Sequence, residues 1–304
     1  MTPIPIVLDC DPGHDDAIAL LLAAAHPALD LRAITTVAGN GQLDKVTLNA
    51  RRICTLARLL DVPIAAGAAG QQGGDPPSAE GIHGESALDG PALPDPVVEL
   101  DPRTPKELIA AQDEPVTLIA TGPLTNVPAM LEQGGAIREV VWMGGSTERG
   151  NTTPYAEFNA WVDPAAAAAV LASGVPFTVV GLNLTHQALA TDDVLARIGA
   201  LGTPLADTVV GWLEFFGGSY RDVFGFAAPP VHDPCAVALV AEPDTVRCAD
   251  AFVAVETEGT WTRGATVVDL DRTLGQAPNA RVALELQVER FWDLVIDAVA
   301  QLGR

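Results

Sequence analysis

The sequence is poor in basic residues. Its 304 residues include 17 lysines and arginines against 39 aspartates and glutamates, which gives a formal net charge of −22. A chain this acidic repels polyanions at long range, so neither nucleic acid nor an anionic membrane is expected as a partner. Lysine occurs only at Lys45 and Lys106, which leaves few candidates for chemistry that depends on a lysine.

Cysteine pairs and long apolar runs are also lacking. The four cysteines, at positions 10, 54, 235 and 248, form no CxxC pair, so no zinc ligand set is indicated. The longest helical apolar run, residues 17–25, is too short to cross a bilayer. The N-terminal residues show neither the basic region nor the cleavage site of a signal peptide. We therefore expect a cytoplasmic protein with reduced thiols.

The chain does have a regular alternation of apolar runs and amphipathic segments. Hydrophobic residues make up 48% and charged residues 18%, a globular composition. Strands are expected at residues 4–8, 31–37, 62–66, 116–120, 140–143, 177–180 and 282–287, with helices between most of them, one of which is expected over 207–216. This alternation predicts an α/β fold with a parallel sheet and helices on both faces. Since no linker or repeat interrupts it, we expect a single domain over residues 1–304.

Residues 67–96 differ from the rest of the chain. They are rich in glycine and proline and have little periodicity. A loop of this length in a compact domain is usually functional or disordered, so we expect an active-site lid here. His83 lies within it, flanked by glycines, although an exposed loop histidine often has no function.

Polar clusters follow several predicted strands. DCDPGHDD, residues 9–16, follows the first strand and places four carboxylates in eight residues. Three more polar segments lie at the ends of later strands: TTVAGN at residues 35–40, TGPLTN at 121–126 and MGGS at 143–146. Ligands of such sheets bind beyond the carboxyl ends of the strands, so these clusters are expected to meet at one site.

The four aspartates have two explanations. Helix capping accounts for Asp15 or Asp16, because a carboxylate at a helix N-terminus complements the dipole. It leaves Asp9 and Asp11 unexplained, and like charges this close raise each other's pKa unless a cation is present. We favour a metal site, of magnesium or calcium because the donors are hard oxygens. Calcium fits better a site that also receives neutral hydroxyls.

These segments together resemble the calcium-dependent nucleoside hydrolases of the inosine–uridine-preferring family. The matching stretches occur in family order between about residues 6 and 240: DCDPGHDDAIAL, AITTVAGN, GIHGES, TGPLTN, VVWMGGS, AEFNAWVDPAAA, GLNLTHQALAT and VHDPCAVA. The resemblance implies a Rossmann-like, mostly parallel open sheet, Ca²⁺ as cofactor and a ribonucleoside as small-molecule substrate. It also implies a homodimer or homotetramer.

The resemblance further implies roles for individual residues. The expected Ca²⁺ ligands are Asp11, Asp16, the backbone carbonyl of Thr125 and the carboxylate of Asp233. The expected ribose-binding residues are Asp15, Asn151, Glu157, Asn159 and Asp233, with Asn40 orienting water or ribose and Met143 beside the sugar. His83 and His232 are expected to flank the base and the 5′ side. Tyr220 is expected in the base pocket, with plain core packing as the alternative.

The implied reaction is hydrolysis of the N-glycosidic bond to free base and ribose. Its oxocarbenium-like transition state carries positive charge, which a negative pocket stabilises. A Ca²⁺-bound water is the expected nucleophile, because the ion lowers the pKa of that water. Asp11 is expected to be its general base. His232, with an ordinary pKa near 6.5, is expected to protonate the leaving base.

Two other functions stay open on the sequence alone. A strand that ends in DCD permits a magnesium-dependent phosphohydrolase with Asp9 as nucleophile and Asp11 as acid, although no lysine follows at a suitable strand end. A non-catalytic ribose- or nucleoside-binding protein is the second alternative. The presence of both Asp11 and His232 argues against it.

Overall fold

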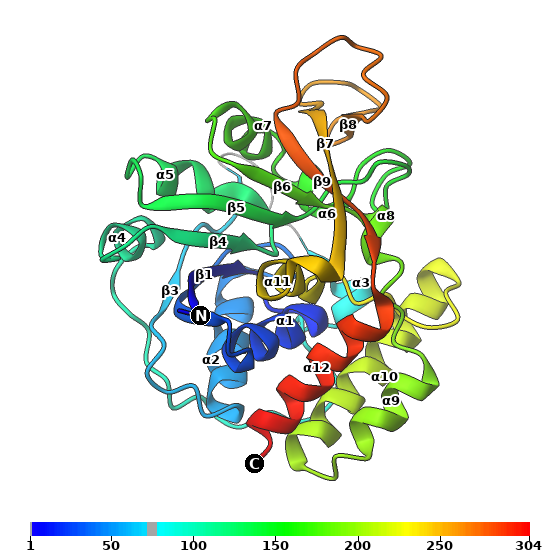
Figure 1. Ribbon diagram of the computed structural model, residues 1–304. Coiled ribbons are helices and arrows are strands. Elements are labelled where there is room, and N and C mark those ends of the chain that lie inside the picture. Colours follow the sequence, from blue (N-terminus) through cyan, green and yellow to red (C-terminus); the bar gives the residue numbers. More distant parts are fainter. Residues whose placement is uncertain (1, 72–77) are drawn as a thin grey trace.

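A computed structural model describes residues 2–71 and 78–304 (Figure 1). In these ranges nine strands form one sheet of order β3-β2-β1-β4-β5-β6-β9-β7-β8. The strands are β1 Ile4–Cys10, β2 Leu29–Thr36, β3 Ile64–Ala66, β4 Val116–Ala120, β5 Ile137–Met143, β6 Phe177–Val180, β7 Val246–Val255, β8 Thr266–Asp269 and β9 Ala280–Leu286. From β3 to β9 neighbours run parallel, whereas β7 is antiparallel to both β9 and β8. The predicted single-domain, Rossmann-like α/β fold with a mostly parallel open sheet is confirmed.

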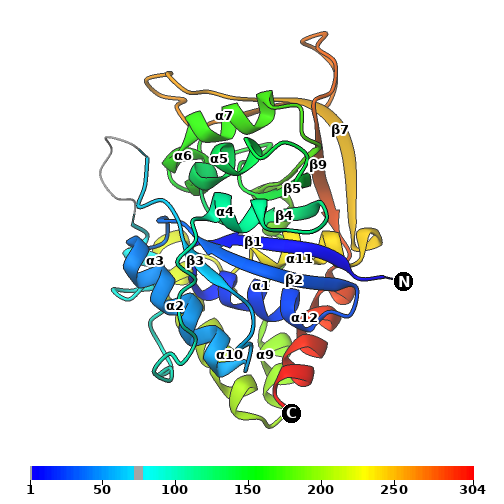
Figure 2. The ribbon, with the colours of Figure 1, turned by 90° about the vertical axis from the view of Figure 1, so that its left-hand side faces the viewer.

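Helices cover both faces of this sheet (Figures 1 and 2). They are α1 His14–Ala25, α2 Leu43–Leu56, α3 Glu80–His83, α4 Pro105–Ala110, α5 Val127–Leu131, α6 Phe158–Val162, α7 Pro164–Ala172, α8 Leu182–Thr185, α9 Asp192–Gly199, α10 Pro204–Phe224, α11 Pro234–Ala241 and α12 Val288–Leu302, with 3₁₀ turns η1 Leu124–Asn126 and η2 Pro243–Thr245. One core packs α1, α2, α11 and α12 against the sheet, and a second core packs α4, α5 and α7 against the other face.

The central strands are mostly apolar and almost completely buried because both of their faces are covered. Every residue of β4 is buried, as are all of β1 except Ile4. Strand β1 lies between β2 and β4, so the chain leaves it first to one side and later to the other. This reversal of strand order opens a crevice at the carboxyl ends of β1 and β4, where such folds bind their ligands.

The structure differs from the sequence-based expectations in two places. Helix α10 runs over Pro204–Phe224, past Gly217 and Gly218, whereas a helix over 207–216 was expected. The antiparallel hairpin of β7 and β8 was not expected. Within the predicted lid, residues 72–77 lie outside the described residues, and the described part carries α3. The role of 67–96 as a lid stays a prediction.

Candidate active site

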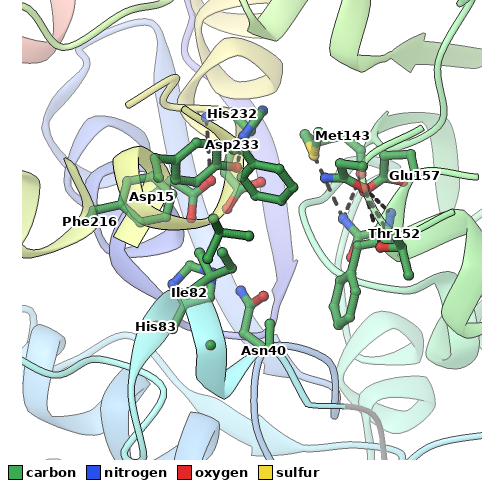
Figure 3. Close-up of a pocket in the computed structure, with 18 of the residues that line it drawn as sticks. Asp15, Asn40, Ile82, His83, Met143, Thr152, Glu157, Phe216, His232 and Asp233 are labelled. Carbon is green, nitrogen blue, oxygen red and sulfur yellow. Dashed lines mark hydrogen bonds between the residues drawn. The ribbon is translucent and has the colours of Figure 1, made fainter. Parts of the chain in front are cut away.

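A cavity of about 400 Å³ lies at the carboxyl end of the sheet. Ten of the residues singled out from the sequence line it: Asp15, Asn40, His83, Met143, Asn151, Glu157, Asn159, Tyr220, His232 and Asp233. In Figure 3, Asp15, His232 and Asp233 face Met143, Glu157 and Thr152 across the cavity, with Asn40 and His83 along a third side. The predicted convergence of distant polar clusters on one site is therefore observed.

An acidic cluster forms one wall. Single carboxylate oxygens of Asp15, Asp16 and Asp233 all lie within 4.8 Å of one another, and all three residues are buried. Asp16 also caps the start of α1, because its Oδ2 accepts a hydrogen bond from the Gly13 amide at 3.0 Å. Asp233 precedes α11 and belongs to a segment more than two hundred residues away. Helix capping thus explains Asp16 in part but not the cluster.

Asp11 lies beneath this wall, at the end of β1. Its Oδ2 accepts a hydrogen bond from the Asn40 amide at 2.7 Å. Its Oδ1 is buried and has no hydrogen-bond partner in the part of the chain that the structure describes. A Cβ at Gly122 would lie 2.6 Å from Oδ1, and a Cβ at Gly39 would overlap Oδ2. The two glycines therefore let the backbone approach the carboxylate closely.

Burial makes the cluster electrostatically unfavourable on its own. Burial, and then the charge of Asp16, raises the pKa of Asp15 to about 7. The pKa values of Asp11 and Asp233 are raised well above the usual range, by burial first and then by neighbouring carboxylates. A divalent cation bound by these carboxylate oxygens would offset both the cost of burying the negative charges and the repulsion between them. The donor set and the unpartnered Oδ1 of Asp11 therefore fit a metal ion.

Thr121 and Thr125 belong to the same TGPLTN segment but have different surroundings. Thr121 follows β4 and lines the cavity, and its hydroxyl donates to Asp16 Oδ1 at 2.8 Å. Thr125, whose backbone carbonyl is the expected metal ligand, lies inside η1, and that role stays a prediction. The threonine that contacts the acidic cluster is Thr121, which the sequence reasoning missed.

The wall opposite the aspartates is held by backbone hydrogen bonds. Glu157 precedes α6, and its two carboxylate oxygens accept from the amides of Gly145, Asn159 and Ala160 at 2.8–3.1 Å. Burial nonetheless raises the pKa of Glu157 to about 7. The side-chain NH₂ group of Asn159 donates to the backbone carbonyls of Thr121 and Met143 at 2.8 and 3.0 Å. These bonds fix polar side chains at the cavity surface.

Asn151 is fixed in the same wall by a neighbouring amide. Its Oδ1 accepts from the Phe158 amide at 2.9 Å, which leaves its side-chain NH₂ group as a possible donor to a ligand.

His232 occupies the far corner with Tyr220 and Thr185. Its Nε2 lies 2.6 Å from the Tyr220 hydroxyl and its Nδ1 lies 2.7 Å from the Thr185 hydroxyl. Burial, and then nearby His186, lowers the pKa of His232 to about 3. The ordinary pKa expected for this histidine is thus wrong, because no carboxylate partner offsets its desolvation. Burial raises the pKa of Tyr220 well above its usual value, so its hydroxyl keeps its proton at neutral pH.

A buried carboxylate cluster at the switch point of a Rossmann-like sheet, facing a cavity rich in fixed polar groups, defines a metal-dependent enzyme for a small hydroxylated substrate. The chain belongs to the inosine-uridine preferring nucleoside hydrolase family, whose family model matches residues 6–293. The predicted family is therefore confirmed, and the chain is a ribonucleoside hydrolase.

Relatives match over nearly the whole chain. A "pyrimidine-specific ribonucleoside hydrolase RihA" of Shewanella oneidensis is 46% identical over 97% of this chain and 96% of its own. The protein of the same name from an Enterobacter species is 44% identical over 99% of both chains. The solved structure of a "purine-preferring ribonucleoside hydrolase" from Gardnerella vaginalis is 28% identical, with a TM-score of 0.89 over 98% of this chain and 99% of that one.

None of the helices in the described ranges has the length and apolar character needed to cross a membrane.

Proposed function

We propose that the protein hydrolyses the N-glycosidic bond of ribonucleosides with a Ca²⁺-bound water as nucleophile, through an oxocarbenium-like transition state. The observation that carries this proposal is the group of buried carboxylates, three of them within 4.8 Å, at the wall of the cavity. Such a pocket favours the positive charge that develops on the sugar when the bond to the base breaks.

The metal would be held by the carboxylates of Asp11, Asp16 and Asp233. We replace Thr125 by Thr121 in this set, because only Thr121 lines the cavity and contacts Asp16. Carboxylates together with a backbone carbonyl are the ligands that Ca²⁺ accepts more readily than Mg²⁺ does. When bound, Ca²⁺ would offset the buried charge, orient the sugar hydroxyls and make a water more acidic.

The remaining polar residues of the cavity would bind the ribose. Asp15 and Glu157, on opposite walls, can accept hydrogen bonds from sugar hydroxyls, and Asn151 and Asn159 offer amide groups. Asn40 donates to the main-chain carbonyl of Asp11 and to Asp16, so it holds the acidic segment in place beside the ribose. The carboxylate of Asp11 would take the proton of the attacking water, the general-base role that the resemblance implies for it.

The leaving base would receive its proton from Tyr220 and not directly from His232. At neutral pH the tyrosine hydroxyl carries a proton, whereas burial disfavours a charged His232. The 2.6 Å contact between the two groups lets His232 Nε2–H donate a hydrogen bond to the tyrosine oxygen once its proton has left, and a proton from solvent then restores the hydroxyl. Water supplies hydroxyl to the sugar and its proton to Asp11, which releases that proton to solvent, so the overall reaction adds one water.

We further propose a preference for pyrimidine nucleosides. Two relatives at 44% and 46% identity carry pyrimidine specificity in their names. In this chain the aromatic side chains that line the cavity include Phe216, Tyr220 and Phe224 of α10, which suits stacking against a base.

A phosphohydrolase with Asp9 as nucleophile fits the structure less well. Asp9 is completely buried, and its Oδ1 accepts from Thr35 at 2.5 Å and from Asn126 at 2.8 Å. It does not line the described cavity. We assign it the structural role of tying β1 to β2 and to η1.

The experiment incubates the purified protein with uridine, cytidine and inosine, in CaCl₂ or in EDTA, and measures ribose and free base. We expect ribose release that requires the metal and is faster for the two pyrimidine nucleosides. No ribose from any common nucleoside would remove the proposal. Phosphate release from p-nitrophenyl phosphate would support the phosphohydrolase. Nucleoside binding by calorimetry without product would support a binding protein.

We also propose a cytoplasmic homodimer or homotetramer. Trp261, Val267 and Leu274 are exposed apolar residues on and beside the β7–β8 hairpin, which projects from the body of the molecule (Figure 1). Burial of such side chains between copies would be favourable. Light scattering after size exclusion tests this, and a monomer at micromolar concentration would refute it.

A further inference from the structure

His14 is the first residue of α1 and directly precedes Asp15, but its side chain lies in an aromatic stack. The imidazole is completely buried and stacks on His83 and on Phe215 and Phe216 of α10, with ring centroids 5.1–5.4 Å apart and interplanar angles of 10–16°. Nothing in the proposed mechanism uses this histidine. Its partner His83, in contrast, lines the cavity.

Hydrogen bonds fix which ring nitrogen of His14 carries the proton. Its Nε2 lies 2.8 Å from the backbone carbonyl oxygen of Asp89, which can only accept. That carbonyl belongs to a rigid turn, since the Asp89 carboxylate accepts from the amides of Glu85 and Ser86 at 3.0 and 3.1 Å. Nε2 of His14 therefore bears the hydrogen. A neutral imidazole has one N–H, so Nδ1 of His14 is left as an acceptor.

The contact between the two rings then determines which ring nitrogen of His83 carries the proton. The Nδ1 atoms of His14 and His83 are 3.0 Å apart, a distance that requires a proton between them, because two bare nitrogens would repel. That proton belongs to His83 Nδ1. The His14 amide lies farther from the same atom, at 3.3 Å, and would favour the opposite form. It cannot supply the proton that the closer contact between the rings needs.

Both rings are neutral, which leaves Nε2 of His83 bare. An imidazolium here would be a buried charge among aromatic rings, which is unfavourable without a carboxylate beside it. Among the described residues, His83 Nε2 has no hydrogen-bond partner, and its ring borders the cavity.

We propose that His14 is a positioning residue that holds His83 in the Nδ1–H form, so that its Nε2 accepts a hydrogen bond from a hydroxyl or N–H of the substrate. The identity of that substrate as a nucleoside rests on the proposed function. Gly13 supports the arrangement, because a Cβ there would lie 2.6 Å from His83 Nδ1 and push the ring away.

The first test reads the protons directly and needs no activity. Long-range ¹H–¹⁵N spectra of the full-length, calcium-loaded protein with labelled histidines are assigned with single His→Gln variants. We expect a protonated Nδ1 and a bare Nε2 for His83, and the reverse for His14. A protonated Nε2 on His83 would overturn the proposal, whether or not the protein hydrolyses nucleosides.

The second test is a double-mutant cycle on uridine hydrolysis. His14→Phe keeps a stacking ring but removes the acceptor, and we expect KM to rise about three- to tenfold, the loss of one hydrogen bond, with kcat nearly constant. The same change in a His83→Phe background should leave KM unaltered. His14→Asn, which offers an acceptor near the Nδ1 position, should restore part of the loss. Equal effects in both backgrounds would show that His14 acts only through folding.

Discussion

Removal of the metal is expected to destabilise the protein more at high pH than at low pH. In the metal-free fold the pKa of Asp15 is about 7, raised first by burial and then by Asp16. A folded-state pKa above the unfolded value means that the folded state holds the proton more tightly. The stability linked to this proton is fully present below the unfolded pKa, near 4, and is lost as the pH rises through about 7.

The size of the effect follows from the shift. Three pKa units correspond to about 4 kcal/mol for Asp15 alone. Asp11 and Asp233 change stability in the same direction, because burial raises their pKa values too. A bound cation requires the ionised carboxylates and offsets the loss. We expect Ca²⁺ to raise the melting temperature by only a few degrees at pH 5 and by about 10 °C at pH 8.

The assay is thermal unfolding followed by circular dichroism, in EDTA and in 1 mM CaCl₂ across pH 5–8. Asp163→Asn is the matched control, since Asp163 is a buried aspartate that caps α7 and lies outside the cluster. This variant should keep the full pH-dependent difference between the melting temperatures in CaCl₂ and in EDTA, whereas Asp16→Asn should reduce that difference. A difference that is constant or becomes smaller toward pH 8 would refute the reasoning.

Four further changes have defined outcomes. Asp11→Ala should lower kcat for uridine at least about 10²-fold without lowering the melting temperature in EDTA at pH 8, because it removes a buried charge; substantial turnover would reject the general base. Gly13→Ala should raise KM, since its Cβ would meet a histidine ring 2.6 Å away; an unchanged KM would contradict the geometry. Tyr220→Phe should lower kcat for uridine about 10²- to 10⁴-fold but spare p-nitrophenyl riboside, whose leaving group needs no proton; equal losses on both substrates would exclude the tyrosine as acid. Thr121→Val should weaken Ca²⁺ binding measured by calorimetry, because it removes the hydroxyl that donates to Asp16 Oδ1; an unchanged affinity would show that this hydrogen bond does not support the metal site.

Many elements of the fold can be predicted from short segments of the sequence. The strands β4 and β6 have the bounds expected from their apolar runs, 116–120 and 177–180. These segments are buried on both faces, so their hydrophobicity is continuous and stands out from the flanking turns. Helix α10 could not be bounded this way, because Gly217 and Gly218 suggest an end. In the structure the helix continues to Phe224 and ends at Gly225, which has φ 74°.

The β7–β8 hairpin gave no comparable signal. Residues of β7 alternate irregularly between buried, half-buried and exposed. Its pairing with β9 also contains a register shift between Arg247 and Cys248. A strand at the border of a sheet is defined by its partner more than by its own periodicity.

The site shows the same division between local and distant information. Spacing after a strand identified the acidic segment, because its four aspartates lie within eight consecutive residues. The pKa of His232 could not be read in this way, since it depends on burial and on contacts with Thr185 and Tyr220 from two other helices. His232 could be identified from the sequence, whereas its pKa depends on the environment that the fold creates.

The choice between Thr121 and Thr125 shows why a motif alone does not assign a ligand. Both threonines lie in TGPLTN, and nothing in the letters separates them. The strand decides: β4 ends at Ala120, so Thr121 is the first residue past the sheet edge, beside the acidic end of β1. Four residues later the chain has turned into η1, and Thr125 is not among the residues that line the cavity. In a parallel sheet the residue directly after the strand is therefore the better candidate for a site at its carboxyl edge.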